Sequence, residues 1–102
     1  MKQVKVADRS ALSPGKPLSV QVEDRTIALF DVGGTLRAID DTCTHAGASL
    51  AEGEVEGGVV VCPWHGARFD LATGDVQCPP ASRPVRSYRV SLQGQEIWVE
   101  LD

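Results

Sequence analysis

Two short segments hold the side chains of this sequence that are best able to bind a metal. Cys43-Thr44-His45 is a C-x-H motif, and Cys62-Pro63-Trp64-His65 is a C-x-x-H motif. They contain both histidines and two of the three cysteines of the chain, and sixteen residues separate His45 from Cys62. Thiolates and imidazoles are the groups that bind zinc ions and iron–sulfur clusters in proteins. We therefore take Cys43, His45, Cys62 and His65 as the candidate metal ligands.

The way the ligands are divided between the motifs helps to distinguish the possible metals. A lone cysteine or histidine is most often a structural side chain, but two Cys/His pairs at chelating spacing are hard to explain in that way. A Cys₂His₂ set can bind zinc in a structural module. Common zinc motifs of this type, however, place the two cysteines together and the two histidines together. One Cys and one His in each motif suit a [2Fe–2S] cluster with both thiolates on one iron and both imidazoles on the other. The spacing favours the cluster and leaves a zinc-binding module as the alternative.

Short strands joined by tight turns are the elements that must position the two motifs. Glycine and proline recur about every eight to twelve residues, a spacing typical of a β-sandwich or barrel. Apolar runs and alternating segments predict strands around 4–6, 18–22, 26–32, 36–39, 54–56, 59–61, 68–70, 86–92 and 96–101. Residues 40–53 have no period and predict a long loop, and the one helical turn that we expect lies near 8–12. The pattern predicts an all-β fold with each motif in a loop at the end of a strand.

The composition suits one domain and argues against several classes of function. The chain has 102 residues with 42% hydrophobic and 24% charged residues, close to the averages of globular proteins. A net charge of −4 disfavours nucleic-acid binding, which needs a basic patch. No apolar run approaches the roughly 18 residues of a membrane span, no secretory signal is apparent, and an odd number of cysteines fits a reducing compartment. We expect a cytoplasmic single domain over residues 1–102, with no nucleic-acid or membrane partner.

At the two motifs the sequence resembles a known family. Their residues and their separation match the Rieske pattern, C-x-H followed by C-x-x-H. The segments 41–45 and 62–70 resemble Rieske ferredoxins that serve aromatic-ring-hydroxylating dioxygenases. Thr73-Gly74, the prolines at 79, 80 and 84, and the hairpin from Tyr88 to Trp98 also fit that class. The resemblance therefore covers nearly the whole chain.

The resemblance implies both a fold and a function. The fold would be a Rieske-like antiparallel β-sandwich or barrel, with a small cluster-binding lobe (about 41–70) formed by the loops at 41–53 and 62–70. The function would be that of a monomeric one-electron carrier between a flavin-dependent NAD(P)H reductase and a terminal ring-hydroxylating oxygenase of aromatic hydrocarbon catabolism. No catalytic residues are expected, because both histidines are used and none remains for a mononuclear iron. The alternative in the same family is the small Rieske subunit of an assimilatory NAD(P)H nitrite reductase.

Departures from the respiratory Rieske proteins refine this expectation. Those proteins carry a disulfide between the cluster loops, where this chain has Ala48 and Pro63. They also direct Ser and Tyr hydroxyls at the cluster, where this chain has Ala67 and Phe69. Without hydroxyl donors the sulfurs stay electron-rich, which predicts a low reduction potential. Cys78, beside two prolines and no basic residue, is expected to have a buried structural role.

Metal analysis and substitution test the ligand assignment. Purified protein should contain about two iron and two acid-labile sulfide per chain and negligible zinc, because each motif supplies one Cys and one His. Normal cluster assembly should be abolished by Cys43→Ser, Cys62→Ser, His45→Ala and His65→Ala, and should survive Cys78→Ser. A colourless protein with one bound zinc would reject the cluster. Loss of the cluster in Cys78→Ser, together with a normal spectrum in His45→Ala, would reject the ligand set.

Overall fold

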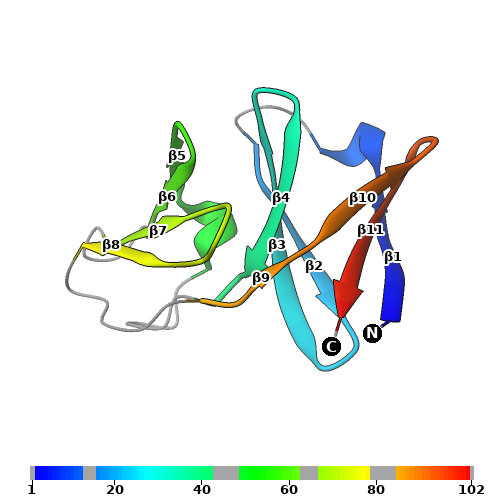
Figure 1. The fold of residues 1–102 in the computed structure, drawn as a ribbon, viewed down its shortest axis with the longest axis horizontal. Coiled ribbons are helices and arrows are strands. Elements are labelled where there is room, and N and C mark those ends of the chain that lie inside the picture. The colour runs from blue at the N-terminus through cyan, green and yellow to red at the C-terminus, as the bar shows by residue number, and fades with distance from the viewer. Residues whose placement is uncertain (1, 13–15, 43–48, 63–66, 79–84, 102) are drawn as a thin grey trace.

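The computed structural model describes residues 2–12, 16–42, 49–62, 67–78 and 85–101. Within these residues it has eleven strands and two single 3₁₀ turns. Figure 1 shows how the strands are arranged. The strands are β1 (Lys2–Asp8), β2 (Leu18–Val22), β3 (Arg25–Val32), β4 (Thr35–Asp40), β5 (Glu54–Glu56), β6 (Val59–Val61), β7 (Arg68–Asp70), β8 (Val76–Cys78), β9 (Ser87–Tyr88), β10 (Val90–Gln93) and β11 (Glu96–Leu101). The 3₁₀ turns are η1 (Arg9–Ala11) and η2 (Leu50–Glu52). The prediction of an all-β fold is confirmed.

The strands form three antiparallel sheets. Their orders are β1-β11-β10, β2-β3-β4-β9 and β5-β6-β7-β8. In Figure 1 the second of these lies in the middle, with β1, β10 and β11 on one side and the small β5–β8 sheet on the other. We call the first two sheets the base and the β5–β8 sheet, with the segments that join it to the base, the lobe. None of the helices in the described part of the chain has the length and hydropathy that a membrane crossing requires.

Strand β3 divides the interior of the protein into two cores. Its residues from Ile27 to Asp31 are all buried, the pattern of a strand covered on both faces. Because successive side chains point to opposite faces, Ile27 and Leu29 join the base core that contains Ile97. Ala28 and Phe30 join the lobe core. The members of the lobe core are Ala28, Phe30, Ile39, Leu50, Val60, Cys62, Ala67, Phe69, Leu71 and Val85.

The strand predicted at 86–92 is wrong in one respect, because the structure contains two strands there. Tyr88 in β9 pairs with Ala38 in the middle sheet, whereas Val90 in β10 pairs with Val99 in the outer sheet. Arg89, which is exposed, lies where the chain passes from one sheet to the other. The backbone on both sides is extended, so the periodicity of the sequence contains no sign of the change of partner.

The loop predicted at 40–53 is also more ordered in its described part than expected. Asp40 completes β4, and residues 50–52 form the 3₁₀ turn η2. The short edge strand β8, which ends at Cys78, was not predicted from the sequence. The single turn expected near residues 8–12 is confirmed as η1.

Gly74 offers a test of how tightly the lobe is built. Its φ is +81°, and a Cβ built there would lie 2.1 Å from the carbonyl oxygen of Val85. Gly34 has a similar φ of +89° but nothing within 4 Å of such a Cβ, so Gly34→Ala is the matched control for backbone strain alone. We expect Gly34→Ala to destabilise the protein by about 1–2 kcal/mol, and Gly74→Ala by about 2 kcal/mol more, which lowers the thermal midpoint by roughly a further 8–16 °C. Equal midpoints for the two variants would contradict this packing.

Candidate metal centre

The structure describes one of the four candidate ligands. Cys62 directly follows β6 and is 2% exposed. Cys43, His45 and His65 lie outside the described residues, as do Ala48, Pro63 and Trp64. Within the residues that the structure describes, no three His, Cys, Asp or Glu side chains are grouped so that they could hold a metal ion. The four-residue ligand set therefore stays a prediction.

The two ends of each ligand loop meet in the structure. Thr42 and Ser49 form an isolated antiparallel bridge across the first loop. Across the second loop, the backbone N–H of Cys62 donates to the carbonyl of Ala67 over 2.7 Å. Each loop therefore starts and ends on a fixed backbone contact.

Described residues that flank the two ligand loops belong to the same apolar cluster, the lobe core. Leu50, which follows the first loop, and Cys62 and Ala67, which flank the second, all belong to the lobe core. Val85, which follows the segment 79–84, belongs to it as well. Segments far apart in the sequence therefore end at one packed cluster of side chains, from which water is largely excluded. A buried thiol in the same cluster as residues that flank both loops fits a metal cluster held by those loops.

Gly53 brings the first loop against the strand that leads to Cys62. A Cβ on Gly53 would lie 2.1 Å from the carbonyl oxygen of Val61 and 3.3 Å from that of Leu50. The N–H of Gly53 donates to the Leu50 carbonyl over 3.0 Å. Glycine is therefore needed here for close approach of two backbones rather than for a special φ. The contact sets the position of the segment after the first motif relative to the start of the second.

Asp41, just before the first loop, is a buried residue whose role sequence reasoning missed. It is 6% exposed, and its carboxylate accepts hydrogen bonds from Ser49 Oγ at 2.8 Å and from the Ala51 N–H at 2.9 Å. Ser19 Oγ donates to it over 3.4 Å. An acidic residue before a loop usually lies in solvent, so the sequence contained no direct sign of this network.

Tyr88 forms hydrogen bonds between the strands of the base to which the lobe is attached. Its hydroxyl donates to Asp40 Oδ1 over 2.5 Å and accepts from Arg25 Nη1 over 3.2 Å. Burial, and next the hydrogen bond to Asp40, raise the pKa of Tyr88. The phenol therefore remains protonated, and remains a donor, throughout the neutral range. Asp40, Tyr88 and Arg25 come from β4, β9 and β3, so these hydrogen bonds join three strands of the middle sheet.

The acidic residues that flank the two motifs in the sequence differ in their local contacts. Glu56 forms an ion pair with Arg68 at 2.8 Å. Asp70 accepts from the N–H groups of Ala72 at 2.8 Å and Thr73 at 3.2 Å, and so stabilises the turn after β7. Glu52 and Glu54 are exposed and line, with Gly53, Val61 and Cys62, a surface cavity of about 350 Å³. The acidic side chains adjoining Cys62 are therefore these last two.

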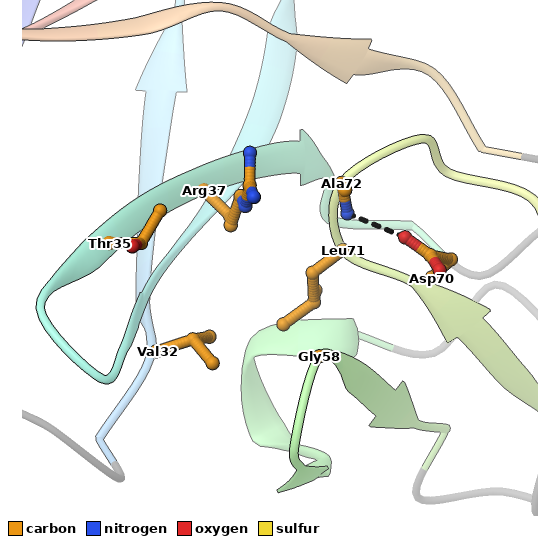
Figure 2. Close-up of a pocket in the computed structure, with 7 residues that line it drawn as sticks. All are labelled: Val32, Thr35, Arg37, Gly58, Asp70, Leu71 and Ala72. Atoms are coloured by element: carbon orange, nitrogen blue, oxygen red, sulfur yellow. Dashed lines mark hydrogen bonds between the residues drawn. The ribbon is translucent and has the colours of Figure 1, made fainter.

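A second cavity, of about 230 Å³, lies between the β3–β4 hairpin and the lobe. Figure 2 shows Val32 and Leu71 pointing into it, and Arg37 and Asp70 also line it. The backbone N–H of Leu71 donates to the Gly58 carbonyl over 2.8 Å, which joins two of the segments that line the cavity. None of the described residues that line it is a cysteine or a histidine, so we treat this cavity as a gap between base and lobe rather than as the metal site.

The fold and the loop anchors agree with a family match. Residues 2–89 match the family model of the Rieske [2Fe–2S] domain, and the chain belongs to this family. It is similar to the ferredoxin component of the naphthalene 1,2-dioxygenase system of Pseudomonas aeruginosa, with 38% identity over 85% of this chain and 84% of the relative. The cofactor of the chain is therefore one Rieske-type [2Fe–2S] cluster, and a zinc module is excluded.

Solved structures extend the similarity. The ferredoxin of carbazole 1,9a-dioxygenase from Nocardioides aromaticivorans has 35% identity and a TM-score of 0.90, covering 97% of both chains. A complex of reduced oxygenase and oxidized ferredoxin in carbazole 1,9a-dioxygenase contains a chain with 36% identity and a TM-score of 0.87, covering 95% of this chain and all of that one. A putative nitrite reductase small subunit has a TM-score of 0.85 at 20% identity, covering 99% of this chain and all of that one, and so shares the fold alone. The relatives named as ferredoxins are electron-transfer components and not the catalytic oxygenases.

The surroundings of Cys62 predict the reduction potential. Ala67 and Phe69 are fully buried in the same core as Cys62, and neither offers a hydroxyl to its sulfur. We expect a potential of roughly −150 mV, at the low end of the Rieske range. The double variant Ala67→Ser, Phe69→Tyr should raise it, because both new hydroxyls enter the core that contains Cys62.

Redox titration with mediator dyes measures this effect. Val99→Thr is the control, since it adds a buried hydroxyl to the base core and should leave the potential unchanged. A wild-type potential well above zero would contradict the explanation. Equal shifts in the double variant and in Val99→Thr would contradict it as well.

Proposed function

We propose that this protein is a one-electron carrier that receives electrons from a flavin-dependent NAD(P)H reductase and delivers them to a terminal ring-hydroxylating oxygenase. The observation that carries the proposal is the similarity, over 95% of this chain, to a chain from a complex of oxygenase and ferredoxin. The names of the curated relatives, which are ferredoxin components of dioxygenase systems, support the same role. We place it in the cytoplasm as a monomer, acting in the catabolism of aromatic hydrocarbons.

We further propose the ligands of the cluster. Cys43 and Cys62 would bind one iron, and His45 and His65 the other, as the spacing of the two motifs indicates. The bound cluster supplies reversible one-electron chemistry. The chain itself supports it with buried Cys62, with two loops closed at their roots, and with an apolar core beneath them. No residue of the chain is proposed to be catalytic.

The distribution of charge supports guided docking of the lobe. Residues 49–78 contain five acidic residues and one arginine, a net charge of −4 that equals the net charge of the whole chain. The remainder of the protein therefore has a net charge of zero. A carrier charged in this way should approach a basic surface of its partner with the lobe first.

The small subunit of a nitrite reductase is the alternative function. The observation that favours it is the shared fold with such a subunit, but at 20% identity this supports the architecture and not the partner. As an obligate subunit the chain would form a large, stable complex with a sirohaem reductase, whereas a carrier forms a small and transient one. Co-expression with each partner and size-exclusion chromatography would separate the two.

Stopped-flow electron transfer to the cognate terminal oxygenase tests the proposed function. The rate should fall as salt rises from about 50 to 500 mM, because salt screens the attraction between the acidic lobe and a basic surface. Trp64→Ala should slow transfer severalfold with little change in potential, since an aromatic side chain between two ligands suits the centre of a contact.

Trp98→Ala is the matched control for this experiment. Trp98 lies in β11, in the sheet on the far side of the base from the lobe (Figure 1), and its Nε1–H donates to Glu96 over 3.3 Å. This variant should transfer electrons at the wild-type rate. Salt-independent rates, or an equal loss in both tryptophan variants, would place the docking surface elsewhere. Failure of the reduced protein to donate to the oxygenase at all would reject the function.

A further inference from the structure

Asp41 occupies an unusual position next to the first ligand loop. It lies two residues before Cys43 and is one of the two buried charged residues in the part of the chain that the structure describes. Its Oδ1 accepts from the Ala51 N–H at 2.9 Å, and Ser49 Oγ lies 2.8 Å from both carboxylate oxygens. No lysine or arginine of the described residues forms an ion pair with it. Among the described residues, the carboxylate is thus held by neutral donors and has no cationic partner.

The backbone of Asp41 adds two further contacts. Its N–H donates to the carbonyl of Thr26 over 3.0 Å, which ties it to the start of β3. Its carbonyl accepts from the N–H of Leu50 over 2.6 Å, which ties it to η2. The residue that precedes the ligand loop is therefore bonded to the three residues that follow it, Ser49, Leu50 and Ala51.

We propose that Asp41 is a positioning residue of the cluster site with two effects. Its carboxylate fixes the two ends of the segment that carries Cys43 and His45, and its negative charge lowers the potential at which the cluster accepts an electron. Reduction adds a negative charge, so a fixed negative charge beside the ligand segment disfavours it, and burial limits the screening by solvent. The inference rests on the proposed ligand set.

Asp31 is the natural comparison for a purely structural role. It is the other buried carboxylate, 8% exposed, and it accepts from Arg9 Nη2 at 2.6 Å and from the Gly34 N–H at 3.0 Å. It lies at the opposite end of β3 from the Thr26 contact of Asp41, about 17 Å away at the rise of an extended strand. Loss of its charge should affect the fold and not the cluster.

Three variants separate the two effects of Asp41. Asp41→Asn retains an acceptor oxygen but removes the charge. It should keep its iron and show a rise in potential that corresponds to about a three- to tenfold shift of the redox equilibrium toward the reduced form.

Ser49→Ala retains the charge but removes one donor. It should keep the potential of the wild type and lose its visible absorbance to a chelator severalfold faster. Asp31→Asn should lower the thermal midpoint while the potential and the rate of cluster loss stay unchanged.

Other results of the same measurements would overturn the inference. A wild-type potential in iron-replete Asp41→Asn, or equal potential shifts in Asp41→Asn and Asp31→Asn, would remove the role of the charge. A wild-type rate of cluster loss in Ser49→Ala would remove the role of the carboxylate in holding the loop, and this variant tests that role even if Asp41→Asn does not fold. Wild-type protein without iron and sulfide would instead reject the proposed function, so the two failures are distinguishable.

Discussion

Burial of β3 on both faces is the constraint on which the rest of the structure depends. A strand with two apolar faces needs a cover on each side, and here the outer sheet of the base supplies one and the lobe the other. The lobe therefore holds the ligand loops and also completes the burial of Ala28 and Phe30. Displacing it would expose those side chains together with Cys62. Stability of the fold and integrity of the site are coupled through this shared core.

The lobe is inserted into the base at a single place. Its chain leaves after β4 and returns before β9, two strands that pair with each other in the middle sheet. At the junction the N–H of Asp40 donates to the carbonyl of Arg86 over 2.9 Å, and Tyr88 bonds to the side chain of Asp40. Entry and exit are therefore held side by side. An insertion anchored in this way can vary in its loops while the paired strands beneath it keep their register.

The sequence predicted most of this architecture where local pattern and burial agree. The predicted strands on either side of residues 33–34, 57–58 and 94 form hairpins with glycine in their turns, because turn chemistry and alternation are local properties. The break between β9 and β10 could not be predicted, since exposed Arg89 suits a continuous strand equally well. The spacing of Cys and His identified the cofactor, which the family match confirms, whereas the assignment of the individual ligands stays a prediction. The role of Asp41 depends on contacts with Ser19, Ser49 and Ala51 that no periodicity reveals.

The charges of the lobe must meet two demands that conflict. Guided docking requires uncompensated acidic side chains, but each negative charge close to the cluster also disfavours its reduction. The structure separates the two roles by burial. Glu52 and Glu54 are exposed, so in the proposed docking they would act on a partner through solvent, and screening by salt would keep their effect on the potential small. Buried Asp41 is screened far less and has no surface to present to a partner, so its charge acts mainly on its own loop. A low potential and a fast, salt-dependent encounter can therefore be adjusted by different residues of the same acidic lobe.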